Sequence, residues 1–242
     1  MPLLARPTRP GVFDAVRMPG CGMISAPSPN FDERDGPVEF LVLHYTGMPD
    51  AASAIALLRS PEAKVSSHYV VDEDGAVYQL VPEEKRAWHA GISYWRGRRA
   101  LNGVSIGVEI VNPGHEWGYR PFPAAQMAAV RDLCLGIRAR HPVPARNVVA
   151  HSDIAPNRKQ DPGELFGWPG LAAAGIGVWT DDFCESRGLR EDLAAIGYDV
   201  TLPLGDVIRA FQRHFLPQNL SGEADEQTLR RAAAVRALVD PG

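Results

Sequence analysis

The pattern of hydrophobic and polar positions first predicts a set of short, buried strands. The run VEFLVLHYT (38–46) is apolar, rich in branched and aromatic residues, and too short for a helix, as is typical of a central strand. GVSIGVEIV (103–111) is a second such run, and a shorter one covers 147–150. Two short runs flank Asp74-Gly75 and predict a β-hairpin, because this dipeptide favours a tight turn.

Helical patterns lie between these runs. Asp50 is a favourable N-cap for a helix through AASAIALLRS, which Pro61 would end. Over 123–140 apolar residues recur at spacings of three and four, so an amphipathic helix is expected with Pro123 at its start. Strands with interposed helices predict an α/β fold, with a mixed central β-sheet flanked by helices.

The pattern changes character after Asp181. Three helical patterns follow, namely ESRGLREDLAAIGY, LGDVIRAFQRHFLP and EADEQTLRRAAAVRALV. Three short helices with their own apolar stripe predict a small, separable domain. We therefore expect an N-terminal extension over 1–27, an α/β domain over 28–175 and a three-helix domain over 181–242.

Composition and charge exclude some classes of partner. The 242 residues, 45% of them hydrophobic, suffice for one full core and a small second domain. A net charge of −4 and scattered arginines provide no basic surface for a phosphate backbone, so no nucleic-acid partner is expected. Cys21, Cys134 and Cys184 are odd in number and far apart, which predicts free thiols.

The N-terminal segment has no apolar stretch of the length that a signal peptide needs, since prolines and charges interrupt each hydrophobic run. No later run is long enough to span a membrane. These features predict a cytoplasmic protein without membrane insertion. A true start at Met18 or Met23, or a leader outside this reading frame, would instead allow a periplasmic location.

Two histidines occupy positions that favour a metal site. His44 lies at the C-terminal end of one predicted strand and His151 directly follows another, and strand ends are where α/β proteins gather functional groups. A proline-framed loop could return Asp161 toward them. Two imidazoles and a carboxylate suit zinc and leave a fourth position for water. The alternative is that His151 and Asp161 only cap a loop.

An acidic residue also stands out within an apolar strand. Glu109 in GVEIV would be costly to bury unless it faced a cleft, so a functional role is indicated. A surface carboxylate on an edge strand is the alternative.

Five segments, in this order, resemble the N-acetylmuramoyl-L-alanine amidase type 2 family: LHYT, SSHYVVDEDGAVYQLV, AWHAG, NGVSIGVEIVN and HSDIAPNRKQDPG. This family shares its fold with bacteriophage T7 lysozyme and the peptidoglycan recognition proteins. The similarity covers roughly 28–170 and is greatest to amidases that recycle anhydro-muropeptides. It implies hydrolysis of the amide between N-acetylmuramic acid, or its 1,6-anhydro form, and L-alanine in peptidoglycan fragments.

The resemblance also implies a role for each matching residue. It makes His44, His151 and Asp161 the ligands of one catalytic Zn²⁺. Glu109 matches the general base, and Lys159 matches the lysine that stabilises the oxyanion.

Further positions are expected to contact substrate or to support the site. The expected substrate-binding residues are Tyr45, His89, Trp95 and Asn102, although Trp95 could equally anchor a lid. His68 is expected in the core or behind the ligands. Phage relatives have a catalytic tyrosine where this chain has Ser67, so no tyrosine is given that role. The remaining histidines are expected to be structural or exposed: His115, His141 and His214.

The C-terminal helices resemble the peptidoglycan-binding domain 1 family through IGYDV, DVIRAFQRHF and GEADEQTLRRA. A packing domain without a ligand of its own is the alternative. Peptidoglycan fragments are the expected partner, and a monomer is slightly favoured. Two other functions stay open for the whole chain: a peptidoglycan-recognition module without activity, and a phage-type endolysin acting on intact wall.

Overall fold

The structure, a computed structural model, describes residues 16–17, 22–34 and 36–240. Two predictions from the sequence lie outside these residues: the interpretation of the N-terminal segment as lacking a signal peptide, and the free thiol of Cys21. Cys134 and Cys184 are both free thiols, as expected. None of the described helices combines the length and the hydropathy needed to cross a bilayer.

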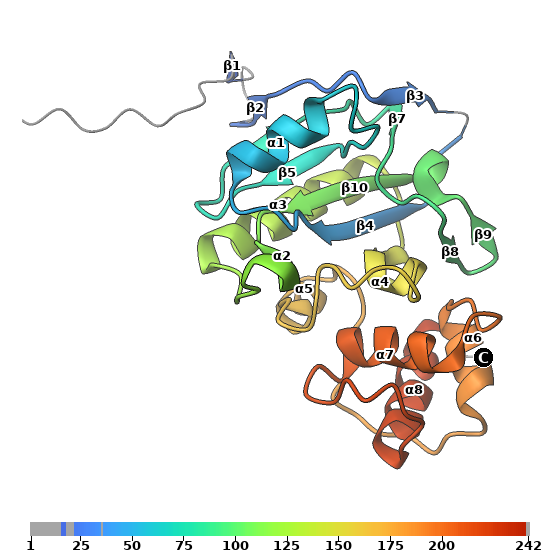
Figure 1. Cartoon of the computed structure of the whole chain (residues 1–242). Helices are drawn as coiled ribbons and strands as arrows, with labels where there is room; N and C mark the ends of the chain where they lie inside the picture. Colours follow the sequence, from blue (N-terminus) through green and yellow to red (C-terminus); the bar gives the residue numbers. More distant parts are fainter. Residues whose placement is uncertain (1–15, 18–21, 35, 241–242) are drawn as a thin grey trace, which may run out of the picture.

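A seven-stranded sheet lies at the centre of the α/β part (Figure 1). Its strands, in their order across the sheet, are β1 (Val16–Arg17), β2 (Ile24–Ser25), β6 (Val77–Gln79), β5 (Tyr69–Val71), β10 (Ser105–Ile110), β4 (Phe40–Tyr45) and β11 (Val148–Ala150). The pairs β5–β10, β10–β4 and β4–β11 are parallel, whereas β5–β6 is the antiparallel hairpin predicted from the sequence. This mixed sheet confirms the predicted fold class.

Two small sheets and eight helices complete the described architecture. The small sheets pair β3 (Phe31–Glu33) with β7 (Lys85–Ala87), and β8 (Tyr94–Trp95) with β9 (Arg98–Arg99). The helices are α1 (Ala51–Arg59), α2 (Gly114–Trp117), α3 (Ala124–Arg140), α4 (His151–Ile154), α5 (Trp168–Ala173), α6 (Leu189–Ile196), α7 (Leu204–Phe215) and α8 (Glu226–Val239). Short 3-10 turns cover Leu101–Val104 and Ala145–Asn147.

Side chains of the central strands alternate between two differently covered faces. Leu41 and Leu43 point to the face that packs on α3 and α5. Phe40 and Val42 point to the opposite face and join the core formed with α6–α8. His44 continues the second series, and Glu109 lies opposite it in register on β10. Both therefore belong to the face that α3 leaves free.

Helices α6–α8 pack against the α/β part at helix α4 (Figure 1). Asp153 of α4 is buried, and both of its carboxylate oxygens accept hydrogen bonds from the three-helix part, one from the segment between α6 and α7 and one from α7. Tyr198 Oη donates to Oδ1 at 2.6 Å, and His214 Nδ1 lies 2.7 Å from Oδ2. His214 also stacks on Trp168, with ring centroids 3.9 Å apart. The three-helix part thus contacts the helix that carries His151, and its wall-binding role stays a prediction.

Removing the Tyr198 hydroxyl tests this contact. Tyr198→Phe is expected to lower the free energy of unfolding by about 1.5–3 kcal/mol, because it withdraws a hydrogen bond from a buried carboxylate. Urea unfolding of the whole chain measures the loss. Tyr94→Phe is the matched control, since no hydrogen bond of its hydroxyl is found among the described residues, and it should stay near wild type. Equal stability of both variants would contradict the bracing role of Asp153.

Candidate metal centre and active site

Two histidines reach the site because neighbouring parallel strands end side by side. His44 is the second-last residue of β4. His151 directly follows β11, the strand that pairs with β4. The sequence predicts a rigid loop from His151 onward, whereas the structure has the short helix α4 before that loop. The Asp153 side chain accepts the Ala150 N–H at 2.8 Å, which stabilises the start of this helix.

Asp161 returns to the histidines through the loop that follows α4. The Ser152 N–H donates to the Asp161 carbonyl oxygen at 2.9 Å, which ties the end of the loop to its beginning. Within the loop, the Lys159 N–H donates to the Ala155 carbonyl oxygen at 3.0 Å. These backbone contacts, rather than the prolines alone, set the position of the carboxylate.

Three potential ligand atoms face one another at the resulting site. His44 Nδ1 lies 2.9 Å from His151 Nδ1, and both nitrogens lie 3.0 Å from Asp161 Oδ2. The three side chains are buried, with exposed fractions of 1%, 4% and 6%. Within the described part of the chain, this is the only group of histidines, cysteines and acids that could hold a metal ion.

The chemistry of the three residues fits a divalent metal. Burial, assisted by the neighbouring His151, lowers the pKa of His44 to about 4, so its ring is neutral near pH 7. Neutral imidazoles and a carboxylate are the forms in which these residues bind metals.

Glu109 and Lys159 line the same cleft, which has a volume of about 340 Å³. Glu109 Oε2 is buried and has no hydrogen-bond partner in the structure. Burial, followed by the charge of Asp161, raises the pKa of Glu109 well above its usual range, and Lys159 opposes this shift. Glu109 as a whole is half-buried, but a buried carboxyl oxygen without a partner is costly unless it has a function.

Tyr45 lies in the cleft wall as part of a chain of contacts that the sequence did not indicate. Its hydroxyl lies 3.0 Å from His115 Nδ1, and His115 Nε2 lies 3.1 Å from a Glu164 oxygen. Arg213 of α7 lies 3.6 Å from the other oxygen of Glu164. His115 therefore lines the cleft, although it was expected from the sequence to be structural or exposed. Its position shortly after the end of β10, near the strand ends that carry the site, could have indicated this place.

The other three expected substrate contacts lie in different surroundings. His89 lines the cleft but is only 8% exposed, and its Nδ1 lies 3.0 Å from His44 Nε2. Asn102 Oδ1 accepts the backbone N–H groups of His89 and Ala90, at 3.1 and 2.7 Å. Trp95 is 3% exposed and packs on Tyr198, so it is not available to stack on a sugar. For Trp95, the lid-anchor alternative agrees better with its burial.

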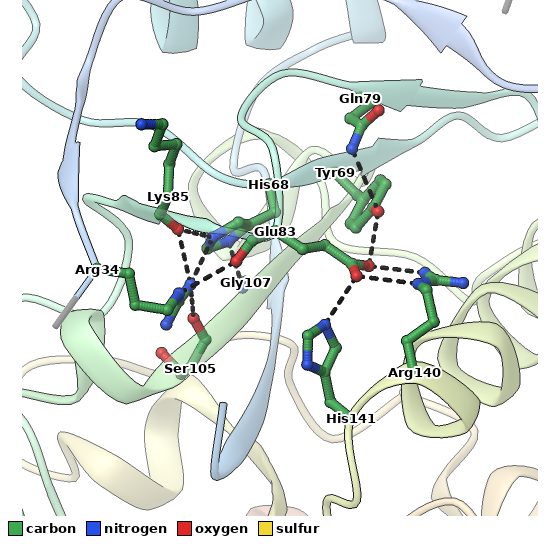
Figure 2. Close-up of polar contacts among 10 residues, drawn as sticks. All are labelled: Arg34, His68, Tyr69, Gln79, Glu83, Lys85, Ser105, Gly107, Arg140 and His141. Carbon is green, nitrogen blue, oxygen red and sulfur yellow. Dashed lines mark hydrogen bonds and ion pairs between the residues drawn. The ribbon is translucent and has the colours of Figure 1, made fainter. Parts of the chain in front are cut away.

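His68 is fully buried beside His89, as expected for a core position, and Figure 2 shows its polar contacts. Its Nδ1 accepts the Gly107 N–H at 3.0 Å, so the ring hydrogen is on Nε2, which donates to the Lys85 carbonyl oxygen at 3.0 Å. Arg34 donates to the carbonyl oxygens of Lys85 and Ser105, at 2.8 and 2.9 Å. This buried cluster ties β7 to the start of β10.

Glu83 is the centre of a second cluster in Figure 2. It accepts hydrogen bonds from Tyr69 at 2.7 Å and from Arg140 at 2.7 and 2.9 Å, and one of its oxygens lies 2.8 Å from His141 Nε2. Burial alone would raise the pKa of Glu83, but these hydrogen bonds outweigh it and lower the pKa from 4.5 to about 2. His141 is thus structural, in agreement with the expectation.

The depressed pKa of Glu83 predicts a pH-dependent contribution to stability. The contribution should be complete above pH 4.5, the ordinary pKa, and should be lost as the pH falls toward about 2. At pH 7 Glu83→Gln is expected to cost about 1.5–3 kcal/mol in urea unfolding. The difference in the free energy of unfolding between Glu83→Gln and wild type should become smaller below pH 4.5. Glu84→Gln, at an exposed neighbour, is the control, and a gap that does not change with pH would refute the prediction.

Known proteins are similar to this chain in sequence. The family described as N-acetylmuramoyl-L-alanine amidase matches residues 34–164. N-acetylmuramoyl-L-alanine amidase AmiD of Escherichia coli is 42% identical over 229 residues, which span 82% of each chain.

Two solved structures are similar over most of the chain. One is AmiD from E. coli in complex with anhydro-N-acetylmuramic acid-L-Ala-D-gamma-Glu-L-Lys, with a TM-score of 0.74 and 40% identity. It covers 84% of this chain and 91% of that one. The other is AMPDH3 from Pseudomonas aeruginosa in complex with anhydromuramic pentapeptide, with a TM-score of 0.72, 34% identity and the same coverage of both chains.

Proposed function

The chain belongs to the N-acetylmuramoyl-L-alanine amidase family, and from this premise we propose that it is a zinc-dependent amidase acting on anhydro-muropeptides. It hydrolyses the amide bond between N-acetylmuramic acid, or its 1,6-anhydro form, and L-alanine. The observation that carries the proposal is that the three ligand atoms lie in the same cleft as Glu109, whose Oε2 is buried without a hydrogen-bond partner. A recognition module without activity would not need an acid with a buried oxygen left without a partner.

His44, His151 and Asp161 are the residues that hold the metal. When bound there, zinc supplies a Lewis acid that polarises the amide carbonyl and lowers the pKa of water. The protein's own groups then control the protons. Glu109 takes a proton from the attacking water and passes it to the departing amine of L-alanine. The Lys159 ammonium, at the cleft rim, opposes the negative charge that develops on the carbonyl oxygen.

The substrate class follows from the relatives. Both solved complexes contain an anhydromuramic acid linked to a peptide. The cleft of this chain combines apolar residues such as Leu57 and Trp88 with cations, Arg158 and Lys159, and so offers surfaces for a sugar and for acidic peptide groups. These features support soluble wall fragments as the substrate and cell-wall recycling as the role.

The direct test is to incubate the zinc-loaded protein with purified anhydro-N-acetylmuramyl tripeptide and to follow the free stem peptide by mass spectrometry. Release of peptide by the wild type, and its loss in Glu109→Ala, is expected. Intact sacculi in a parallel reaction separate recycling from endolysin activity, since a recycling enzyme should prefer the soluble fragment. No release by wild-type protein with zinc bound would refute the proposal.

A further inference from the structure

A line of three buried side chains runs from the start of β10 to the metal centre. Ser105 Oγ lies 3.1 Å from His89 Nε2, and His89 Nδ1 lies 3.0 Å from His44 Nε2. Their exposed fractions are 0%, 8% and 1%, so bulk water does not compete for most of these groups. None of the catalytic steps above uses Ser105 or His89.

The direction of each hydrogen bond in this line can be deduced from its far end. The Leu101 carbonyl oxygen can only accept, and Ser105 Oγ lies 2.7 Å from it, so the single hydroxyl hydrogen points there. Ser105 Oγ must then accept the hydrogen on His89 Nε2. Because a neutral imidazole carries one ring hydrogen, His89 Nδ1 is an acceptor and His44 Nε2 is the donor to it.

We propose that Ser105 and His89 are positioning residues that keep the ring hydrogen of His44 on Nε2, so that Nδ1 offers its lone pair to the metal. This inference rests on the proposed zinc site and gives its supporting residues. Hydrogen bonds of this kind fix the tautomer and the orientation of metal-binding histidines. His89 therefore acts through His44, in place of the substrate contact expected from the sequence.

The same segment orients the second histidine ligand. His151 Nε2 lies 3.3 Å from the carbonyl oxygen of Ala90, the residue after His89, so the ring hydrogen of His151 is also on Nε2. Asn102 holds this segment through both backbone N–H groups. The Nδ1 atoms of His44 and His151 and the Asp161 carboxylate then meet as three acceptors without a hydrogen between them. A cation removes their mutual repulsion.

Gly107 provides the space for the His89 ring. A Cβ atom on Gly107 would come within 2.5 to 2.8 Å of three atoms of the ring, far closer than side chains pack. Gly107 lies next to Val42 in register, on the same face of the sheet as His44. The glycine in this apolar strand is therefore explained by the ring that lies over it, and Gly107→Ala should displace that ring.

Imidazole ¹⁵N NMR of the zinc-loaded wild-type protein tests the inference without any substitution. Long-range ¹H–¹⁵N correlations distinguish a ring hydrogen on Nε2 from one on Nδ1. We expect His89 to carry it on Nε2, with His44 binding zinc through Nδ1. A hydrogen on His89 Nδ1 would overturn the proposal, because His44 would then lack an acceptor.

Zinc affinity, measured by competition with a chelator, gives a second readout. His89→Leu and Ser105→Ala are expected to weaken zinc binding by about 10- to 100-fold. His89→Asn should bind more tightly than His89→Leu, because an amide oxygen can take the place of Nδ1 as acceptor. Circular dichroism of the zinc-free variants shows whether they are folded. If His89→Leu does not fold, the test relies on Ser105→Ala, which removes only one buried oxygen.

The outcomes separate this inference from the proposed function. Wild-type protein that fails to bind zinc would refute the zinc amidase itself. If wild-type protein binds zinc and both Ser105→Ala and His89→Leu bind it with wild-type affinity, only the positioning role is refuted. Loss of affinity in both, with partial recovery in His89→Asn, supports it.

Discussion

Glu109→Gln is expected to lower kcat on anhydro-muropeptide by about 100- to 10,000-fold, the range that general acid–base catalysis supplies. Gln has nearly the same shape but can neither take nor return a proton at the reacting water and amine. Because Glu109 is not one of the three residues that face one another at the metal centre, zinc content should stay at one ion per chain. The loss should appear in kcat, with KM changed little, since the substitution leaves the cleft walls intact.

The control for this substitution is Glu84→Gln, which makes the same chemical change at an exposed position outside the cleft. It should retain wild-type kcat and KM. Glu109→Gln should also be at least as stable as wild type, because it removes an ionisable group whose Oε2 is buried without a partner. A Glu109→Gln enzyme with bound zinc and undiminished kcat would show that another group moves the proton.

The positions of His44 and Glu109 could be predicted from the sequence because strands impose a strict alternation. The apolar runs 38–46 and 103–111 mark two buried strands, and β4 and β10 lie within them. One polar residue near the end of each run then falls on the same face when the strands pair in parallel. The pattern within each strand and the register between β4 and β10 place both residues on one face, so the sequence alone is nearly sufficient to predict this part of the site.

The contacts behind and beside these residues could not be predicted in the same way. The link from Tyr45 to His115 and Glu164 joins three segments far apart in the sequence, and no periodicity relates them. Strands β1 and β2 have two residues each, too few to show an alternating pattern. The placement of Ile24–Ser25 in the main sheet also carries the structured part back into the segment assigned to an N-terminal extension.

The docking of α6–α8 illustrates a third limit. Their amphipathic patterns predict helices, but such patterns do not state which surface the apolar stripe covers. In the structure, the apolar stripe of these helices covers part of the sheet face opposite α3, where it packs with Val42 of β4 and Val149 of β11. The polar contacts of Asp153 with Tyr198 and His214 fix the orientation. A domain that looks separable in sequence thus shares a core with the α/β part.

Asp161→Ala is expected to abolish high-affinity zinc binding, and with it the activity. Two imidazoles without the carboxylate offer only two of the three protein ligands typical of a catalytic zinc site. Thermal unfolding across a zinc titration gives the cleanest measurement. With free zinc at 100 times its dissociation constant, wild-type protein should gain about 2.7 kcal/mol of stability, whereas Asp161→Ala should gain none.

Two further variants make this test specific to the ligand. Asp132→Ala removes an exposed carboxylate on α3 and should keep the full zinc-dependent gain. Asp161→Cys offers a thiolate, another common zinc ligand, at the same position and should recover part of the gain. A stabilisation by zinc that persists in Asp161→Ala would mean that the metal binds elsewhere in the chain. Loss of the gain in Asp161→Ala, with retention in Asp132→Ala, assigns the zinc to the site between β4, β11 and the loop after α4.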